Sequence, residues 1–389
     1  MKAELNPYAP GAGVRPAALV GRDAQIEAWR VALVRLETGK NAQPVVLYGL
    51  RGVGKTVLLS TLASLAEDRK WLVAQVEAGT GKPLRNLIGE SLYGPLSDLV
   101  RPTAGDKLRK ALKTTTSFNA SYDTSGTWNF GLDLSQVAGG GANSGAIESD
   151  LGKVVQDLSL AAEEKDVGLA FLIDEAQDLT PAELAAISSV NHLAGQREWP
   201  FIVALAGLPS IPRMLAEAKS YAERLFVYER IEHLDAELAG LALTEPASAE
   251  GASWSTAAVD LVVAESSGYP YFLQQFGRDT WNAAARPAIT LDDARIGVAT
   301  GRLTLDTGFF RARWDRATRA EKRYLRAMAE DAENTSSTGG IASRLDRDLS
   351  SLGPVRAKLI DKGLIYAPEH GVVSFTVPGM TEFIQRQST

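Results

Sequence analysis

The segment that most constrains this chain runs from Val45 to Thr56, where an apolar stretch breaks into a glycine turn closed by Lys55 and Thr56. It holds the complete pattern G-x-x-x-x-G-K-[ST], and residues 57–63 after it favour a helix. A strand, a glycine turn and a helix in this order direct backbone N–H groups and the positive end of the helix at a phosphate. A plain glycine-rich surface loop would not require the flanking strand and helix. The segment therefore predicts a phosphate-binding loop.

The motif also assigns roles to its residues. Lys55 is expected to reach the β- and γ-phosphates, and the Thr56 hydroxyl is expected to ligate Mg²⁺. The other nucleotide contacts predicted in this segment are Gly49, Arg51, Gly52, Val53, Gly54 and Val57.

Length and composition narrow the remaining possibilities. A chain of 389 residues is expected to form two or three domains. It has no cysteine and only three isolated histidines, which excludes disulfides, zinc-thiolate sites and a histidine metal cluster. Any metal should therefore be a hard cation held by carboxylates and phosphates. No apolar stretch approaches the ~18 residues of a spanning helix, and the first residues lack a secretory signal, so a cytoplasmic protein is expected.

Charge is distributed unevenly along the chain. The net charge of −6 argues against a surface that binds nucleic acid everywhere. Residues 302–389 hold 14 Lys/Arg against 11 Asp/Glu, a balance of +3, which leaves −9 for residues 1–301. The tail is the only region with a basic bias, and the bias is modest.

A second apolar strand, expected over residues 167–173, ends in Asp174 and Glu175. Asp174 at the strand end is expected to hold Mg²⁺ opposite Thr56, and Glu175 is expected to polarise the attacking water. The same two carboxylates could instead cap the following helix. Beside a matching phosphate loop, the pair favours hydrolysis.

Strands and helices alternate in the first part of the chain. Strands are expected over 45–48, 71–77, 167–173 and 201–206, and helices over 24–33, 57–63, 84–99 and 148–164, with Asp23 capping the first helix. This alternation predicts an α/β fold with a parallel sheet and a ligand at the carboxyl ends of its strands. The first twenty residues are expected to form an extended arm. Alternating residues at 117–134 predict a hairpin insertion without Lys or Arg, either a partner contact or a self-packing element.

The rest of the chain is expected to be mainly helical. Residues 1–237 should form the nucleotide-binding domain, 238–301 a helical lid and 302–389 a third domain. In this last part, three helices precede strands at 364–366 and 372–377, with a polar loop at 334–340. Three helices with a two-stranded wing predict a winged helix-turn-helix.

Three segments carry a family resemblance: Leu19–Asp23, the phosphate loop and Phe171–Gln177. Together they resemble the AAA+ ATPases, nearest to the origin-initiator-like group with a C-terminal winged helix, from about residue 7 to 387. The resemblance implies ATP or ADP with Mg²⁺ as ligands and Glu175 as catalytic base. It also implies an adenine pocket and a lid stretch like that of the related STAND ATPases, formed by Val20, Gly21, Arg22, Tyr269 and Pro270.

The resemblance further places Arg224 where these ATPases have an arginine finger, which completes a neighbouring subunit's site, so self-association is expected. An ion pair between Arg224 and a nearby glutamate is the alternative. Two departures stand out. The strand ending at Ala206 lacks a polar residue to sense the γ-phosphate, unless Ser210 serves, and the lid lacks its arginine, unless Arg278 serves. Slow, partner-stimulated turnover is therefore expected.

Two hypotheses remain for what such a switch controls. The first is DNA, bound through the winged helix by the cations Arg344, Arg347, Arg356, Lys358 and Lys362. Interleaved aspartates and a wing without Lys or Arg count against it. The second is a STAND-like signalling ATPase whose nucleotide state controls an effector protein without DNA contact. No membrane partner is expected under either hypothesis.

Overall fold

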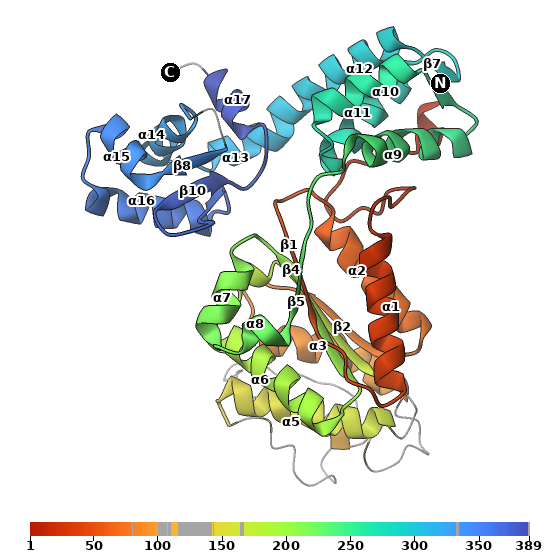
Figure 1. Cartoon of the computed structure of the whole chain (residues 1–389), viewed down its shortest axis with the longest axis vertical. Coiled ribbons are helices and arrows are strands. Elements are labelled where there is room, and N and C mark those ends of the chain that lie inside the picture. The colour runs from red at the N-terminus through yellow and green to blue at the C-terminus, as the bar shows by residue number, and fades with distance from the viewer. Residues whose placement is uncertain are drawn as a thin grey trace.

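The computed structural model describes residues 1–79, 81–99, 107, 110–115, 142, 144–163, 167–331 and 334–387. The hairpin predicted at 117–134 lies outside these residues. Figure 1 shows an α/β domain in its lower half, a group of helices at the upper right and a third region at the upper left. Within the described ranges, no helix combines the length and apolar character needed to cross a membrane.

A five-stranded parallel sheet forms the centre of the α/β domain, in the order β2-β3-β4-β1-β5. The strands are β1 (Val45–Tyr48), β2 (Leu72–Glu77), β3 (Leu169–Asp174), β4 (Phe201–Gly207) and β5 (Val227–Arg230). The edge strand β5 was not anticipated, since its sequence is polar and short. The parallel α/β architecture is confirmed.

Helices cover both faces of the sheet, which explains why the central strands β3, β4 and β1 are mainly apolar. The helices are α1 (Asp23–Glu37), α2 (Lys55–Asp68), α3 (Leu84–Leu99), α5 (Ile147–Glu163), α6 (Pro181–Arg197), α7 (Ile211–Ala218) and α8 (Ala222–Leu225). Side chains alternate between two cores: Leu172 packs on the side of α1 and α2, whereas Phe171 and Ile173 pack on the side of α3, α5 and α6.

The start of α1 differs from expectation. Asp23 is the first helical residue, Arg22 occupies the N-cap position, and no side chain caps the helix. The side chain of Arg22 instead donates to the carbonyls of Val53 and Glu232, which lie outside the helix. These tertiary contacts override the local capping preference that favoured Asp23.

The region predicted as a lid, called the lid below, contains four helices: α9 (Ala236–Ala249), α10 (Thr256–Ser266), α11 (Pro270–Ala283) and α12 (Leu291–Thr304). Strands β6 (Ser253–Trp254) and β7 (Ala288–Ile289) pair beside them. The N-terminal arm begins with a short helix, η1 (Ala3–Leu5), and is anchored on the lid by Tyr8. The buried Tyr8 hydroxyl donates to the Leu243 carbonyl and accepts a hydrogen bond from Trp254 Nε1.

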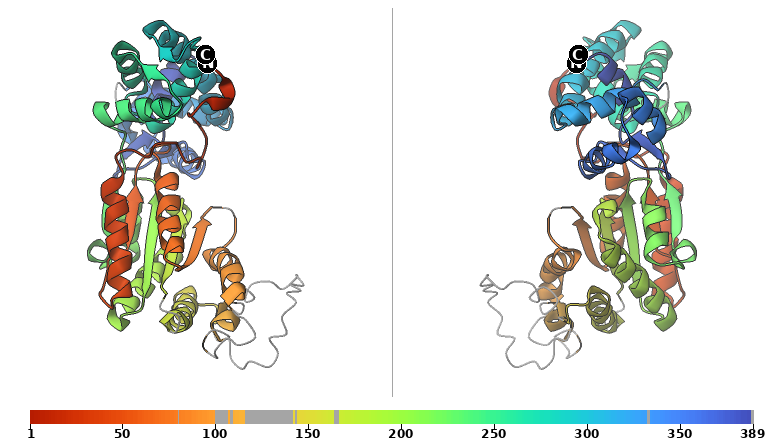
Figure 2. Two further views of the ribbon diagram at one scale, coloured as in Figure 1. Left: turned by 90° about the vertical axis from the view of Figure 1, so that its right-hand side faces the viewer. Right: turned by 90° about the vertical axis from the view of Figure 1, so that its left-hand side faces the viewer.

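The third region begins with one turn of π-helix, η3 (Leu305–Phe310), which runs into α13 (Arg311–Asp315). It continues with α14 (Arg319–Met328), β8 (Thr335–Ser337), α15 (Thr338–Leu345), α16 (Leu349–Asp361), β9 (Ile365–Tyr366), β10 (Val372–Phe375) and α17 (Met380–Gln385). The expected loop at 334–340 is wrong, because β8 pairs antiparallel with β10 and the Ser337 hydroxyl caps α15. Figure 2 shows this region and the lid beyond the same end of the sheet.

Candidate active site

The turn between β1 and α2 has the geometry of a phosphate-binding loop. Gly52 and Gly54 have φ angles of 86° and 94°, which side-chain-bearing residues seldom adopt. Gly49 lies so close to the residue that follows β5 that a Cβ on it would stand 2.1 Å from the Ile231 carbonyl oxygen. The glycine spacing thus reflects backbone geometry, and the loop ends where α2 starts. The N–H groups of the first helical turn have no partner within the helix and are available to an anion.

Lys55 folds back over this turn. Its Nζ donates to the carbonyl oxygens of Gly49 at 3.0 Å and Leu50 at 2.7 Å. Only 8% of the residue is exposed, and burial lowers the pKa of Lys55 to about 8, partly opposed by Glu175 and Asp174. A buried cation held only by carbonyl oxygens is suited to an anionic ligand.

Thr56 and Asp174 meet at the carboxyl edge of the sheet. The Thr56 hydroxyl donates to Asp174 Oδ2 at 2.6 Å. The two residues meet although β4 lies between β3, which ends at Asp174, and β1, which leads into the loop before Thr56. Asp174 Oδ1 accepts from the Glu175 backbone N–H at 2.8 Å. Among the described residues there is no group of three or more carboxylates or histidines that would hold a metal alone. A hard cation at Thr56 and Asp174 would therefore take its remaining ligands from phosphates and water.

Glu175 is held in an uncommon conformation, with φ 48°. Backbone strain of this kind costs of order 1–3 kcal/mol and is found at active sites. Its Oε2 accepts hydrogen bonds from Gln177 Nε2 and from Arg51 Nη2, the latter at 3.4 Å. Gln177 in turn accepts from the Leu208 N–H at 3.0 Å.

Gln177 is a site residue that the sequence analysis missed. Its amide reaches the end of β4, where the sequence lacks a polar residue, and a Cβ on Gly207 would stand 2.4 Å from Gln177 Oε1. Ser210 does not line the site and precedes α7. The sequence did contain two signals for Gln177. It is a polar residue two positions after Glu175, and β4 ends in a glycine, Gly207, which leaves room for its side chain.

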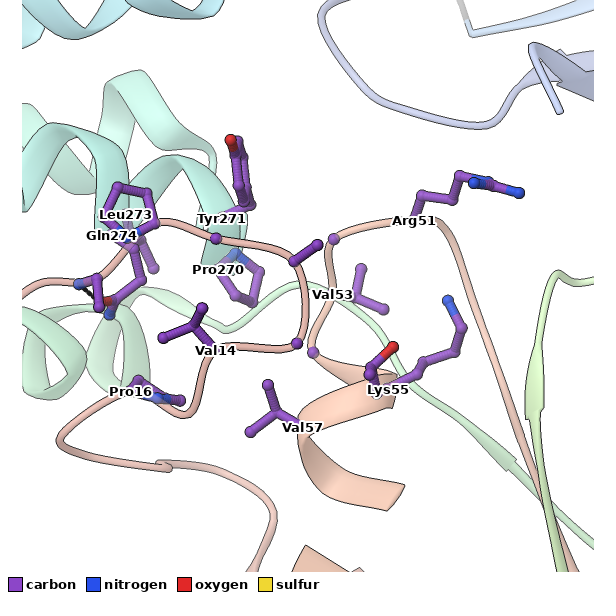
Figure 3. A pocket seen from close by; sticks show the side chains of 18 of the residues that line it. Val14, Pro16, Arg51, Val53, Lys55, Val57, Pro270, Tyr271, Leu273 and Gln274 are labelled. Atoms are coloured by element: carbon purple, nitrogen blue, oxygen red, sulfur yellow. Dashed lines mark hydrogen bonds between the residues drawn. The ribbon is translucent and has the colours of Figure 1, made fainter. Parts of the chain in front are cut away.

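A cavity of about 330 Å³ opens beside the phosphate loop. Figure 3 shows Val14 and Pro16 of the arm, Val53 and Val57, and Pro270 of the lid around it. The predicted residues that line it are Val20, Arg22, Arg51, Gly52, Val53, Gly54, Lys55, Thr56, Val57, Asp174, Glu175 and Pro270. Arm, loop and lid therefore contribute to one cavity.

Three other predicted residues, Gly21, Gly49 and Tyr269, do not line the cavity but pack near it. Gly21, with φ 68°, packs beside Leu238. Gly49 packs against Ile231, as described above. The Tyr269 ring lies against Gly52, where a Cβ would approach its hydroxyl oxygen to 2.8 Å, and burial raises the pKa of Tyr269. Tyr269 thus packs as an uncharged side chain between the lid and the phosphate loop.

Arg51 also contacts the third region, which begins with η3 and is called the C-terminal region from here on. Its backbone N–H donates to the Thr376 carbonyl at 3.0 Å. Its guanidinium lies beside Gly363, where a Cβ would stand 3.0 Å from Nη2. One residue of the loop therefore touches both Glu175 and the C-terminal region.

Arg224 and Arg278 lie away from the cavity. Arg224 is exposed on α8, just before β5, whose first residue pairs with the first residue of β1. It therefore lies at the opposite end of the sheet from Lys55 of the same chain. Arg278 pairs with Asp279 at 3.1 Å, and its carbonyl accepts from the Asn6 side chain.

Comparison with known proteins agrees with this geometry. Residues 18–203 match the family described as the AAA ATPase domain, and residues 307–384 match a domain of unknown function, DUF8462. Residues 18–203 therefore have the α/β fold of an AAA+ P-loop ATPase domain, and the match includes the phosphate loop, Asp174 and Glu175. Comparison of the sequence with curated proteins found no match.

Solved structures extend the likeness to the whole chain. The Walker-type ATPase PABY2304 of Pyrococcus abyssi is 15% identical, with a TM-score of 0.59 over 98% of this chain and 99% of that one. Cdc6p from Pyrobaculum aerophilum is 15% identical (TM-score 0.46; 99% and 97% covered). The Aeropyrum pernix Orc1 protein in complex with DNA is 17% identical (TM-score 0.46; 95% and 93% covered). At 15% identity, the match to the Pyrococcus abyssi ATPase concerns the fold alone.

Proposed function

We propose that this protein is a Mg²⁺-dependent ATPase that works as a nucleotide-controlled switch. The observation that carries the proposal is the meeting of Lys55, Thr56, Asp174 and Glu175 at one edge of the sheet. A cation for the phosphates, two ligands for a metal and a carboxylate base are the groups that hydrolysis of a phosphoanhydride needs.

Thr56 and Asp174 would hold Mg²⁺, because their oxygen atoms already lie in contact. When bound, the metal would neutralise charge on the phosphate oxygens. Lys55 would exchange its two carbonyl partners for phosphate oxygens, which are stronger acceptors for a cation.

Glu175 would act as the base for the attacking water. Both of its side-chain partners bind Oε2, and among the described residues no donor binds Oε1. Oε1 is therefore the oxygen that would take the proton from water. Gln177 would fix the carboxylate and connect it to the end of β4.

The cavity walls suit a purine base beside the phosphates. Val14, Val20, Leu234, Pro270 and Leu273 give it an apolar side. Because aromatic bases bind well between apolar surfaces, a nucleoside triphosphate fits better than free phosphate. The choice of ATP follows the family match at residues 18–203.

Arg51 supports a switch role. It touches Glu175 on one side and Thr376 and Gly363 on the other. A phosphate that draws Arg51 away from Glu175 would also disturb its contacts with the C-terminal region. Nucleotide state and domain position would then be linked through one side chain.

The C-terminal region would act as a winged helix on DNA or on a protein. Helices α14, α15 and α16 followed by β9 and β10 have the order of that fold, with β8 completing its sheet. Lys358 and Arg347 are exposed and are suited to phosphate contacts on DNA.

The alternative is signalling to an effector protein without DNA contact. It is favoured by two other cations of this region, which form internal ion pairs. Lys362 pairs with Glu321 at 2.6 Å, and Arg344 pairs with Asp331. These side chains are less available to DNA than the sequence suggested.

Self-association would use Arg224. Because this arginine lies at the far end of the sheet from its own site, it would act only on the nucleotide of a neighbouring subunit. Its exposure agrees with that role, and Arg224→Ala should keep ATP affinity but lose turnover that depends on protein concentration.

Phosphate release by the full chain and by Glu175→Gln tests the proposed function. The variant should bind ATP with unchanged affinity and hydrolyse it on the order of a hundredfold or more slowly. Unchanged release would reject Glu175 as base. A wild-type protein that binds no nucleotide would reject the function altogether.

A further inference from the structure

An arginine from outside the lid enters the nucleotide cavity. Arg313 belongs to α13, which follows the π-helical turn η3 at the start of the C-terminal region. It lines the same cavity as Lys55, Arg51 and Glu175. It also falls within residues 307–384, which match the domain of unknown function.

The guanidinium of Arg313 is held in place by Phe309. It lies 3.8 Å from the centre of the Phe309 ring, and Nη1 donates to the Phe309 carbonyl at 2.7 Å. Phe309 in turn stacks on Tyr271 of the lid, with ring centres 4.9 Å apart and planes 25° apart. The stack Tyr271–Phe309–Arg313 therefore positions a cation before any ligand arrives.

This cation lacks a counter-ion. Within the described part of the chain, Arg313 forms no ion pair, and the Phe309 carbonyl is the one acceptor that its side chain uses. Burial and the nearby Arg51 lower the pKa of Arg313, which marks an unfavourable site for positive charge in the ligand-free protein.

The whole cavity has the same imbalance. Its charged lining consists of four cations and two carboxylates: Arg22, Arg51, Lys55, Arg313, Asp174 and Glu175. Arg22 and Lys55 are bound to backbone carbonyls, and Arg51 is shared with Glu175. The excess positive charge requires an anionic ligand, and Arg313 has the most unused donors to offer it.

We propose that Arg313 binds the terminal phosphate of the nucleotide in its own subunit. This inference rests on the proposed function. It gives the region of unknown function a direct contact with the nucleotide and makes Arg313 a sensor of triphosphate against diphosphate. Because α13 leads into α14, the contact would transmit nucleotide state to the C-terminal region.

The test compares the binding of a non-hydrolysable ATP analogue and of ADP to the full chain, with Mg²⁺, by calorimetry. Arg313→Met keeps the apolar stem on Phe309 and removes the charge. It should weaken binding of the ATP analogue roughly tenfold to a hundredfold and change ADP binding less than about twofold. Arg313→Lys should restore part of the loss.

The matched control is Arg311→Met, since Arg311 is an exposed arginine on the same helix outside the cavity. It should bind both nucleotides as the wild type does. If Arg313→Met lost both nucleotides equally, or neither, the proposal would be overturned while the proposed function stood.

If the wild type bound neither nucleotide, the proposed function itself would fail. If Arg313→Met did not fold, as judged by its thermal unfolding, Arg313→Lys would carry the test. Because lysine keeps the charge but not the fork of donors, it should reduce the preference for the ATP analogue over ADP. An unchanged preference would reject the assignment.

Discussion

The cavity beside the phosphate loop and the C-terminal region both contain lysine and arginine, but these cations have different partners in the two places. In the cavity, Lys55 and Arg313 donate to backbone carbonyls and have no tight carboxylate partner among the described residues. In the C-terminal region, Lys362 and Arg344 are paired with Glu321 and Asp331. Whether the fold supplies a carboxylate decides whether a cation stabilises the domain or remains available to a ligand.

The largest effect is expected when a cation of the cavity, Lys55, is removed. Lys55→Ala should weaken ATP binding by about a hundredfold or more, because a charged donor to two phosphates disappears. Calorimetry with Mg²⁺ measures it. The exposed Lys40 provides the control, and Lys40→Ala should bind like the wild type. Equal affinities for the two variants would contradict the site.

The next effect concerns the metal ligands. Asp174→Asn should reduce turnover about a hundredfold and raise the Mg²⁺ concentration needed for half-maximal activity, because the carboxylate facing Thr56 is lost. A magnesium titration of phosphate release measures both, and EDTA should stop the wild type. An unchanged magnesium requirement would show that Asp174 does not hold the metal.

In the C-terminal region, removing a counter-ion should affect stability instead. Glu321 caps α14 and pairs with Lys362, so Glu321→Ala should lower the free energy of unfolding by about 2 kcal/mol. Denaturant unfolding measures the change. Glu330→Ala is the control, because its contact with Arg344 is exposed and 3.7 Å long, and should cost less than about 0.5 kcal/mol.

The Glu321 contribution should also depend on pH. Burial alone would raise the pKa of Glu321, but hydrogen bonds from Lys362 and Thr318 outweigh it and hold the pKa below its usual value. The stabilisation is then fully present above the unfolded-state pKa of about 4.3 and is lost as the pH falls through the lower folded-state pKa. A wild type and Glu321→Ala that lose stability in parallel below pH 4.3 would contradict this.

The smallest effect concerns DNA. If the C-terminal region binds DNA, Lys358→Ala should reduce the slope of log affinity against log salt by about 0.9, because one exposed phosphate contact is lost. Arg344→Ala should leave the slope unchanged, since Arg344 is paired internally. Salt titrations of the full chain measure both. The absence of salt-dependent binding by the wild type would favour an effector protein as the target.

Local sequence was sufficient for strands β1 to β4 and the phosphate loop, because their signals lie within a few consecutive residues, but not for the short, polar edge strand β5. It failed at 334–340, where polar residues suggested a loop but pairing with β10 makes Thr335–Ser337 a strand. It also missed Gln177, whose role depends on the position of Leu208 in another segment. The resemblance named Arg278, yet the fold places Asp279 beside it and Arg313 in the cavity.

The sequence by itself determined the ligand chemistry, since glycines, Lys55 and Thr56 must be consecutive for the backbone to surround a phosphate. Tertiary structure alone decided which further charges reach that ligand. The contact of Arg51 with Thr376 and the entry of Arg313 into the cavity join segments far apart in the chain. Such contacts depend on how separate domains pack, and no local preference of the chain encodes them.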